Sequence, residues 1–489
     1  MTVDLPGDIA GRMVERLHAA GFAAFWVGGC VRDFLLGREP EDFDIATDAR
    51  PAQVEKLFAK TIPVGKKFGV VVVVEGGQQF QVAMFRAEAD YRDGRRPERV
   101  ELANAEADAR RRDFTVNGLF YDPATEKIHD WVGGEKDLRA KLIRTIGAPA
   151  ERFGEDHLRM LRAVRFAARL NFEIEPATFA AIQTLAPKIK TISAERVRDE
   201  LIKLFAPPSD KRIDGLMDQW IAGASQHDRA RPARQFMDPA IPQPVAPVAP
   251  AARGLELLRT SGLLEQVLPE LSATIICEQS PDFHPEGSVF NHVRLMLEKM
   301  VQPPPAGHLD AGLDASLPWA VLLHDIAKPV TAERDAATGG VHFYGHEKVG
   351  AAMAETILQR LRFPKKQTEV IVTFVRNHMQ FKDVRQMRKA TLRRLLLRET
   401  LPLELELHRL DCLGSSGKLE DYEFLLREAE ALKHQPALRP PLLTGNDLLA
   451  LGAPRGKRIG ELLREIREKQ LADELSTAAA ALAWVKERL

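Results

Sequence analysis

One stretch near the start of the chain limits the possible folds more than any other. Apolar residues at 22–27 predict a strand, and Gly28 and Gly29 follow it directly. A short amphipathic segment comes next, and a second predicted strand carries Asp42 and Asp44. Because residues i and i+2 of a strand project from the same face, these two carboxylates should converge on one spot. Paired carboxylates beside a glycine turn with free backbone N–H groups suit Mg²⁺ and a triphosphate.

Length and composition limit what can surround that site. The chain has 489 residues, too many for a single core, so several domains are expected. Its 69 basic and 69 acidic residues cancel, so any nucleic-acid surface must be a local patch. Cys30, Cys277 and Cys412 lie far apart without CxxC spacing, which argues against a disulfide framework and a thiolate metal site. There is no apolar signal region or membrane-spanning window, so we expect a cytoplasmic protein with no membrane partner.

Strand signals dominate the first part of the chain and helix signals dominate the rest. The valine-rich residues 70–74 and residues 79–85, separated by a Gly-Gly turn, predict a hairpin. Residues 90–99 are polar and basic and predict a loop. From Glu155 the apolar period changes from two to about 3.6, which predicts helices up to the C-terminus. Residues 221–253, rich in Pro, Ala, Gln and Arg, are expected to form a flexible insertion.

The glycine pair and the carboxylate pair together favour nucleotidyl transfer to a hydroxyl group. Two metal ions about 3.5–4 Å apart can activate the attacking oxygen and stabilise the leaving pyrophosphate. Asp42 and Asp44 can hold both ions. Gly28 and Gly29 allow backbone to come close to phosphates, and Arg32 can neutralise phosphate charge. Each of these patterns is weak alone, since both also occur in ordinary surface turns.

A later segment carries groups suited to the base and sugar of a nucleotide. In the run Arg-Arg-Asp-Phe-Thr-Val-Asn at 111–117, Arg112 supplies a guanidinium and Asn117 an amide, with Asp113 between them. These groups donate and accept hydrogen bonds of the kind that a base and a ribose need. The segment therefore adds three candidate nucleotide-binding residues to the carboxylate site.

Asp156 and Arg159 form a second candidate for base recognition. They sit three apart on a predicted helix and should face the same way. A carboxylate accepts from an exocyclic amine, and a guanidinium donates to a ring nitrogen and a carbonyl. Held together, the pair can match both cytosine and adenine without a nucleic-acid template. Arg162 and Arg165 extend the same basic ridge, although an isolated pair of this kind is usually only a salt-bridged helix face.

Taken in order, these motifs resemble the class II tRNA nucleotidyltransferase and poly(A) polymerase superfamily. The order GGxVRD, DxD, DGRRP, RRDFTxN, DxxGG and EDxxR runs continuously over residues 21–206. The resemblance implies a mixed α/β head followed by helical neck, body and tail. It also implies that Asp42 and Asp44 are catalytic and bind Mg²⁺, and that Asp156 and Arg159 select CTP or ATP. Other residues that it implies for the incoming nucleotide are Gly29, Arg32, Arg112, Arg162 and Arg165.

Two features favour the CCA-adding branch of the superfamily. Residues 64–70 look like the CCA-type sequence, and the more basic GRRF-type stretch of bacterial poly(A) polymerases is absent. The loop at 93–97, whose loss marks relatives that add only the two cytidines, is intact. We therefore expect CCA addition to the 3′ end of tRNA from CTP and ATP. An A-adding enzyme, a poly(A) polymerase and a non-catalytic tRNA-binding protein remain as alternatives.

Gln81 departs from the pattern of the family. The family usually has a glutamate, a third carboxylate, on the strand after the hairpin turn, where this chain has Gln81. An amide does not accept a proton as a carboxylate does, and it is a weaker ligand for Mg²⁺. Either the reaction needs no protein base at this position, or the activity of the head is reduced.

A second set of candidate metal ligands lies in the helical part of the chain. Imidazole and carboxylate together suit Ni, Mn, Co, Fe or Zn, with open positions for water and a phosphate. The order H…HD…H…H…D resembles the HD-type metal-dependent phosphohydrolase domain. That resemblance implies removal of terminal 2′,3′-cyclic or 2′-phosphates, or an HD fold that keeps its metal without turnover. It also leaves open an HD phosphohydrolase with an impaired head, and Lys328 is a candidate phosphate contact. The six candidate ligands are His292, His324, Asp325, His346, His378 and Asp411.

Periodicity and resemblance together predict five segments. We expect an α/β nucleotidyltransferase head with a mixed sheet, followed by all-α neck, body, HD domain and tail. The segments are a head at 1–146, a neck and RNA-binding domain at 147–220, the flexible insertion at 221–253, a body and HD domain at 254–415, and a tail at 416–489.

Overall fold

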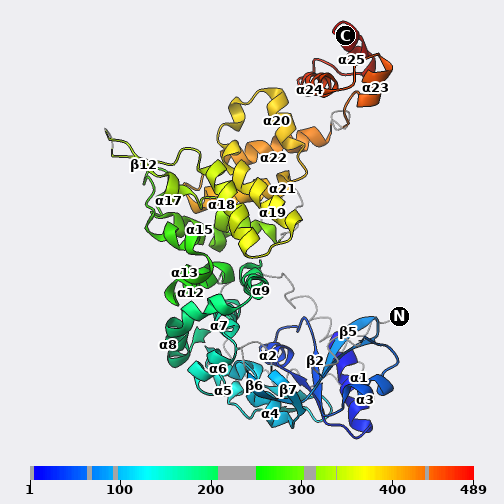
Figure 1. Ribbon diagram of the computed structural model, residues 1–489, viewed down its shortest axis with the longest axis vertical. Coiled ribbons are helices and arrows are strands. Elements are labelled where there is room, and N and C mark those ends of the chain that lie inside the picture. The colour runs from blue at the N-terminus through cyan, green and yellow to red at the C-terminus, as the bar shows by residue number, and fades with distance from the viewer. Residues whose placement is uncertain are drawn as a thin grey trace, which may run out of the picture. The chain divides into compact units, whose positions relative to one another are not determined.

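The chain divides into two compact units, Met1–Pro269 and Glu270–Leu489, which are described separately (Figure 1). A computed structural model describes residues 5–62, 69–91, 97–207, 249–301, 315–336, 339–434 and 440–489. The described residues do not include most of three segments discussed above, namely the CCA-type sequence, the loop and the insertion. The parts outside the described residues are 64–68, 92–96 and 208–248. No helix in the described ranges is both long enough and apolar enough to span a bilayer.

The first unit is built on a seven-stranded mixed sheet in the order β3-β4-β5-β2-β1-β8-β9. Only the β2–β5 pair is parallel among these neighbours, and the other pairs are antiparallel. The predicted mixed α/β head is therefore confirmed. The strands are β1 (Ala24–Val27), β2 (Asp44–Thr47), β3 (Thr61–Ile62), β4 (Val70–Glu75), β5 (Gln78–Met84), β8 (Phe120–Asp122) and β9 (Lys127–His129).

Local sequence explains the centre of this sheet. Branched valines fill β4, and Gly76 and Gly77 turn the chain with φ of +57° and +80° into β5. Positive φ at both turn residues matches the right-handed twist of a two-residue hairpin. The predicted hairpin is confirmed. The predicted loop at 90–99 is partly wrong, because β6 (Arg86–Tyr91) and β7 (Pro97–Leu102) form an antiparallel pair on either side of residues 92–96.

Short helices cover the sheet and position its loops. In α1 (Pro6–Ala19) the buried residues include Ile9, Met13 and Leu17, spaced by four along one face. The helix packs on β1. The other elements of the head are α2 (Gly29–Leu35), α3 (Pro51–Leu57), α4 (Ala105–Arg110), η2 (Thr115–Asn117) and α5 (Gly134–Arg139).

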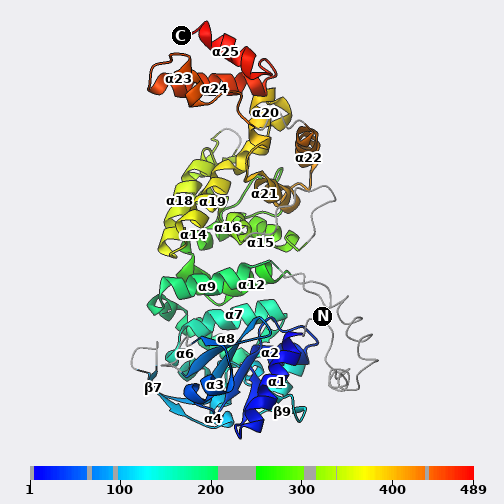
Figure 2. The same ribbon diagram turned by 90° about the vertical axis from the view of Figure 1, so that its right-hand side faces the viewer.

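A layer of helices completes the first unit. It contains α6 (Pro149–Glu155), α7 (Leu158–Leu170), α8 (Pro176–Leu185), α9 (Ala194–Phe205), α12 (Pro250–Thr260) and α13 (Leu263–Val267). α7, α9 and α12 pack on one another, as Figure 2 shows. A Cβ on Gly254 would lie 2.5 Å from Cδ1 of Leu204, so glycine allows α12 to approach α9 closely. Residues from 250 onward therefore pack with the neck, and the unit boundary follows Pro269 rather than the expected position after 253.

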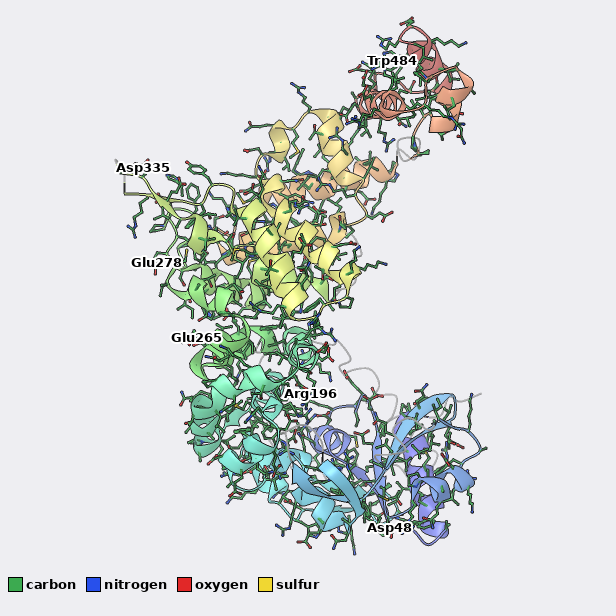
Figure 3. All side chains as sticks on the ribbon, viewed as in Figure 1. Asp48, Arg196, Glu265, Glu278, Asp335 and Trp484 are labelled. Carbon is green, nitrogen blue, oxygen red and sulfur yellow. The ribbon has the colours of Figure 1, made fainter. Side chains whose placement is uncertain are left out.

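The second unit is almost entirely helical, as expected. α15 and α16 pack against α21, and α18 packs along α19. A separate apolar cluster holds the last three helices together, with Trp484 beneath the guanidinium of Arg488 at 4.1 Å (Figure 3). The helices are α14 (Pro269–Ser272), α15 (Val289–Lys299), α16 (Ser316–Leu323), α17 (Lys328–Thr331), α18 (His346–Arg360), α19 (Lys365–Asn377), α20 (Lys389–Leu396), α21 (Leu401–Gly414), α22 (Glu420–Lys433), α23 (Gly445–Ala450), α24 (Lys457–Leu471) and α25 (Ala478–Lys486).

Candidate functional site

The two carboxylates of the head lie at the start of β2. Asp44 is the first residue of the strand and Asp42 precedes it, so the prediction that β2 contains both is wrong by two residues. Phe43 between them is buried against Trp26, with ring centroids 4.8 Å apart, while both aspartates are exposed. Although Asp44 is solvent-exposed as a residue, the protein atoms around its carboxyl group displace water and raise its pKa; the charge of Arg112 opposes this shift and that of Asp42 adds to it. Two neighbouring carboxylates of this kind favour a bound cation.

The neighbour of Asp44 across the parallel strand pair is Gln81. The β2–β5 register places the two residues opposite each other, and Gln81 is exposed. Residues directly opposite in a sheet share a face. The amide therefore occupies the position beside Asp44 where the family pattern has a third carboxylate.

The turn at Gly28 lies in close contact with the guanidinium of Arg112. Gly28 has φ of +77° and ψ of −126°, and a Cβ there would lie 2.7 Å from Nη1 of Arg112. This is backbone that glycine adopts far more readily than other residues. Nη2 of Arg112 donates to Oδ2 of Asp108 at 3.1 Å, and the guanidinium lies 5.1 Å from the centre of the Phe120 ring. The turn thus places a fixed positive charge next to the backbone of Gly28 and close enough to Asp44 to affect its pKa.

Asp113 and Asn117 connect the head to the helical layer. Nη1 of Arg32 donates to Oδ1 of Asn117 at 2.6 Å, and Nδ2 of Asn117 donates to Oδ1 of Asp113 at 3.0 Å. Oδ2 of Asp113 accepts from Nε of Arg162 at 2.8 Å. Burial raises the pKa of Asp113, but Arg162, Asn117 and the N–H of Phe114 outweigh it and hold this pKa at about 2. Both residues are buried and paired, so they orient the two arginines on either side of them.

Asp156 and Arg159 do not share a helix, which corrects the prediction. Asp156 lies between α6 and α7 in extended backbone, and its Oδ1 accepts from the N–H of Leu158 at 3.1 Å. Its Oδ2 accepts from Nη2 of Arg196 on α9 at 2.7 Å, and Figure 3 labels this arginine. Arg159, inside α7, forms an ion pair with Glu155. No local signal identifies Arg196, because it lies 40 residues further along the chain.

Arg162 and Arg165 share Glu200 as a partner, and Arg162 is also paired with Asp113, so the two arginines do not form an open ridge. Nε of Arg165 lies 2.6 Å from Oε2 of Glu200, and Nη1 of Arg162 lies 3.6 Å from Oε1 of the same residue. Both guanidinium groups also lie near the ring of Phe166, at 4.2 and 5.3 Å. Glu200, on α9, is 6% exposed and was not anticipated from the sequence. Together α7 and α9 therefore carry paired charges facing the head motifs.

In the second unit, the six predicted ligands come together; we call them the HD cluster (His292, His324, Asp325, His346, His378 and Asp411). His292 lies on α15, and the His324–Asp325 pair follows α16. His346 begins α18, His378 follows α19, and Asp411 lies on α21. Five helices, α15, α16, α18, α19 and α21, thus bring these six residues together, as the distances below show.

Asp325 lies at the centre of the HD cluster. Its Oδ1 is 3.2 Å from Nε2 of His346 and 3.6 Å from Nε2 of His378, and its Oδ2 is 3.2 Å from Nε2 of His324. Nε2 of His292 lies 3.0 Å from Oδ1 of Asp411. Burial raises the pKa of Asp325, but His324 and Lys328 outweigh it and hold this pKa well below its usual range. The carboxylate is therefore available as an ionised ligand.

All four histidines of the cluster have Nδ1 beside a backbone carbonyl. The distances are 3.3 Å from His292 to Gly414, 3.0 Å from His324 to Val321, 2.8 Å from His346 to Phe343, and 2.6 Å from His378 to Val375. A carbonyl only accepts hydrogen bonds, so each Nδ1 faces its carbonyl as the donor, which leaves Nε2 as the ring atom directed toward the centre of the cluster. Nε2 of His346 and Nε2 of His378 lie 3.1 Å apart there.

The lone pairs of these rings fit a metal ion. Nε2 of His292 and of His324 are buried and make no hydrogen bond within the described part of the chain, despite the nearby carboxylates. Ligand atoms of His292, His324 and Asp325 lie within 4.8 Å of one another, as do those of Asp325, His346 and His378. Nitrogen and oxygen donors without sulfur suit a divalent transition metal.

Three residues near the cluster were not anticipated as ligand neighbours. His284 and Glu286 lie on the segment before α15, and Oε1 of Glu286 is 2.8 Å from Nδ1 of His292. Gln279 accepts through Oε1 from Nζ of Lys328 at 2.6 Å. Lys328, predicted as a phosphate contact, also lies 2.7 Å from Oδ2 of Asp325. The carboxyl of Glu286 precedes His292 by six residues, a spacing with no recognisable motif.

Comparisons with known proteins match the parts of the chain that contain the two candidate sites. Residues 24–144 match the Poly A polymerase head domain, residues 171–217 match the probable RNA and SrmB-binding site of polymerase A, and residues 307–413 match the HD domain. The CCA-adding enzyme of Staphylococcus aureus (strain bovine RF122 / ET3-1) is 45% identical over 194 residues, 40% of this chain and 48% of that protein. That of Streptococcus suis (strain 05ZYH33) is 46% identical over 194 residues, with the same shares. The chain thus spans about half the length of the curated relatives it matches.

Solved structures extend the similarity to nearly the whole chain. The crystal structure of the Bacillus stearothermophilus CCA-adding enzyme in complex with CTP is 26% identical, with a TM-score of 0.68, and the match covers 99% of this chain and 98% of that one. The Thermotoga maritima CCA-adding enzyme complexed with tRNA shares the fold at 17% identity and a TM-score of 0.56, over 100% and 97% of the two chains. The chain is therefore similar to the class II tRNA nucleotidyltransferases and poly(A) polymerases in its head and in its overall fold, and residues 307–413 match the HD domain.

Proposed function

We propose that this protein adds CCA to the 3′ end of tRNA from CTP and ATP, without a nucleic-acid template. The observation that carries the proposal is the carboxylate pair at the start of β2 beside the Gly28 turn and Arg112, in a head whose curated relatives are named CCA-adding enzymes. This reaction uses tRNA, CTP and ATP as partners, and these are found in the cytoplasm.

Asp42 and Asp44 are the residues that we propose hold Mg²⁺. When bound, a pair of such ions activates the 3′-hydroxyl oxygen and stabilises the leaving pyrophosphate. Gly28 and Gly29 bring backbone close to the triphosphate, and Arg112 and Arg32 supply positive charge beside it. These chain groups orient the α-phosphate for attack by the 3′ oxygen.

We propose that Asp156 and Arg159 read the base after exchanging their present partners. Asp156 is bound to Arg196 and Arg159 to Glu155, so each group is already ordered at the junction of α6 and α7. A cytosine or adenine edge would replace these protein contacts with hydrogen bonds of the same kind. Arg162 and Arg165, held by Glu200, complete the proposed nucleotide pocket.

A product analysis tests the proposal. The purified protein is incubated with tRNA ending before, within or after CCA, and with CTP, ATP or both. We expect growth from each incomplete end that stops after the terminal A, and no incorporation by Asp44→Asn. Long A tails would instead identify a poly(A) polymerase, and A addition only to CC-ended tRNA an A-adding enzyme.

We propose a metal-dependent phosphohydrolase activity for the HD cluster, because its donor atoms converge beside Lys328. The cluster suits Ni²⁺, Mn²⁺ or Co²⁺, and Lys328 supplies positive charge for a phosphate. The test uses tRNA ending in a 2′,3′-cyclic phosphate, in which one water opens the ring to a phosphomonoester and a second water releases inorganic phosphate; both products are measured, with Asp325→Asn as the inactive variant. Phosphate release without any nucleotide incorporation would favour an HD phosphohydrolase with an impaired head.

A further inference from the structure

The carboxylate of Glu286 lies between two histidines, only one of which belongs to the HD cluster. Oε1 of Glu286 is 2.8 Å from Nδ1 of His292 and 2.8 Å from Nδ1 of His284. The Glu286 side chain is 5% exposed and that of His292 is fully buried. Oε2 of Glu286 is buried and has no hydrogen-bond partner within the described ranges. A buried carboxylate with one oxygen unpaired requires an explanation, because burying such a group is unfavourable.

The segment that carries Glu286 is held in place by backbone bonds on both sides. Glu278 and Ser288 form an antiparallel bridge, and the N–H of Gln279 donates to the carbonyl of Gly287 at 3.2 Å. Nδ2 of Asn291, in the first turn of α15, donates to the backbone carbonyl of Glu286 at 3.2 Å. The position of the carboxylate therefore follows from a closed loop joined to the helix that carries His292.

We propose that Glu286 is a positioning residue for the metal of the HD cluster. Nδ1 of His292 donates to two acceptors, the carboxylate of Glu286 and the carbonyl of Gly414. The lone pair of the neutral ring then lies on Nε2, on the side of Asp411. Among the four histidines of the cluster, within the described residues, His292 is the one whose Nδ1 also lies beside a carboxylate. A carboxylate on the far nitrogen fixes the ring and makes it a more basic ligand.

His284 supports Glu286 rather than completing a second metal site. Ligand atoms of His284, Glu286 and His292 lie within 4.8 Å of one another, so a second ion there must be considered. That ion would take Nδ1 of His292 while the first takes Nε2. Neutral imidazole has one lone pair, so His292 would have to lose its last N–H proton to bind both. A hydrogen-bonded row from His284 through Glu286 to His292 needs no such loss.

Metal titration of the full-length chain tests this inference, which depends on the proposed metal binding of the HD cluster. Asp42→Asn with Asp44→Asn serves as the background, so that the carboxylate pair of the head does not contribute. Co²⁺ is the probe, since its visible absorption reports ligand geometry and its affinity is measured by titration. We compare Glu286→Gln and Glu286→Ala with Glu278→Gln, an exposed carboxylate on the same segment (Figure 3).

We expect one Co²⁺ per chain at the HD cluster and an affinity about 10- to 100-fold weaker in Glu286→Ala, with a changed absorption spectrum. The Co²⁺ affinity of Glu286→Gln should lie between those of the background protein and Glu286→Ala, because the amide oxygen still accepts from Nδ1 of His292. The affinity of Glu278→Gln should equal that of the background protein. Equal thermal unfolding in EDTA shows that each variant is folded. The inference is overturned if Glu286→Ala binds Co²⁺ with unchanged affinity and spectrum. It is also overturned if the background protein binds two Co²⁺ ions and Glu286→Ala alone binds one, because Glu286 would then be a metal ligand. Absence of Co²⁺ binding in the background protein overturns the proposed metal site as well.

Discussion

Gln81 is the residue whose side chain bears most directly on the rate of the proposed nucleotide addition. It lies opposite Asp44 in the parallel pair. We expect Gln81→Glu to incorporate CTP and ATP at an equal or higher rate, because a carboxylate there adds a ligand or base beside Asp44. A general base contributes about 10²–10⁴-fold when the reaction needs one.

The measurement is single-turnover CTP incorporation into tRNA that lacks CCA. Gln79→Glu is the matched control, because Gln79 is also exposed and lies two residues away on the same face of β5. A severe loss in Gln81→Glu, with Gln79→Glu unaffected, would mean that the amide has a role of its own.

Asp113 gives a prediction about pH and stability. Its pKa in the folded chain is about 2, below the usual value of 3.8, so the charged carboxylate stabilises the fold above pH 4. That contribution, about 2 kcal/mol at most, is lost as the pH falls from 4 toward 2. We expect Asp113→Asn to be less stable than the parent chain at pH 7, and the difference to shrink at pH 4 and below.

Urea unfolding followed between pH 7 and pH 3 measures this difference. Asp48→Asn is a suitable control, because Asp48 is a partly exposed carboxylate of the head that accepts from the N–H of Ala23. A stability difference for Asp113→Asn that does not change with pH would contradict the assigned pairing with Arg162.

Single residues differ in how far the sequence alone could place them. The grouping of the HD cluster followed from the resemblance of the ordered H…HD…H…H…D pattern to HD domains, and the structure brings these six residues together. Their role as metal ligands stays a prediction. The surroundings of Asp156 were not predictable from the sequence, because spacing alone does not distinguish a residue at the end of a helix from one inside it. Its partner Arg196 comes from packing of α9, which no local pattern encodes.

At the scale of elements, the turn between β1 and α2 depends on glycine for two separate reasons. Gly28 has positive φ, and its missing side chain leaves room for Arg112. Gly21 has φ of +85°, but a Cβ there would have no atom of another residue beyond its chain neighbours within 4 Å, so only the positive φ applies to it. Gly21→Ala therefore separates backbone strain from displacement of Arg112.

We expect both Gly28→Ala and Gly21→Ala to lower stability by about 1–3 kcal/mol through backbone strain. Only Gly28→Ala should lose nucleotide incorporation, by about 100-fold, because a displaced guanidinium no longer lies beside the triphosphate. Thermal unfolding and the kcat/KM for CTP measure the two effects. Similar activity in the two variants would rule out a special role for the close approach to Arg112.

The elements themselves were partly predictable. The valine strand and the Gly-Gly turn of the β4–β5 hairpin carry strong local signals, and these agree with the structure. Residues 86–91 and 97–102 are rich in charge, and the two strands that they form, paired only with each other, do not show the apolar alternation on which strand prediction relies. The β6–β7 pair was therefore mistaken for part of a loop.

At the scale of the whole molecule, the two proposed sites draw on different units. The carboxylate pair and its arginines lie within Met1–Pro269, and the HD cluster lies within Glu270–Leu489. We expect Asp325→Asn to abolish transition-metal binding by the HD cluster while CCA addition persists, and Asp44→Asn to have the reverse effect. Metal content after dialysis, together with both activity assays, measures this. Loss of both activities in either variant would contradict separate sites.

The position of the unit boundary could not be predicted from composition. The run at 221–253 suggested a natural division, but α12 follows it and packs on α7 and α9. When a helix after an insertion packs on helices before it, the local apolar periodicity does not indicate that contact. This packing explains the glycine at position 254, because the close contact with Leu204 leaves no room for a side chain there.

The carbonyl contacts of the four HD histidines have a consequence for how the protein handles its ion. Because each ring is already oriented by a backbone carbonyl, from its own helix, from the turn beside it or, for His292, from α21, little reorganisation should accompany metal entry. Binding energy is then not consumed in ordering ligands, in contrast to small domains that fold only around their metal. A chain stripped by a chelator should accordingly keep its helices and recover its ion quickly, so that occupancy follows the supply of metal in its surroundings.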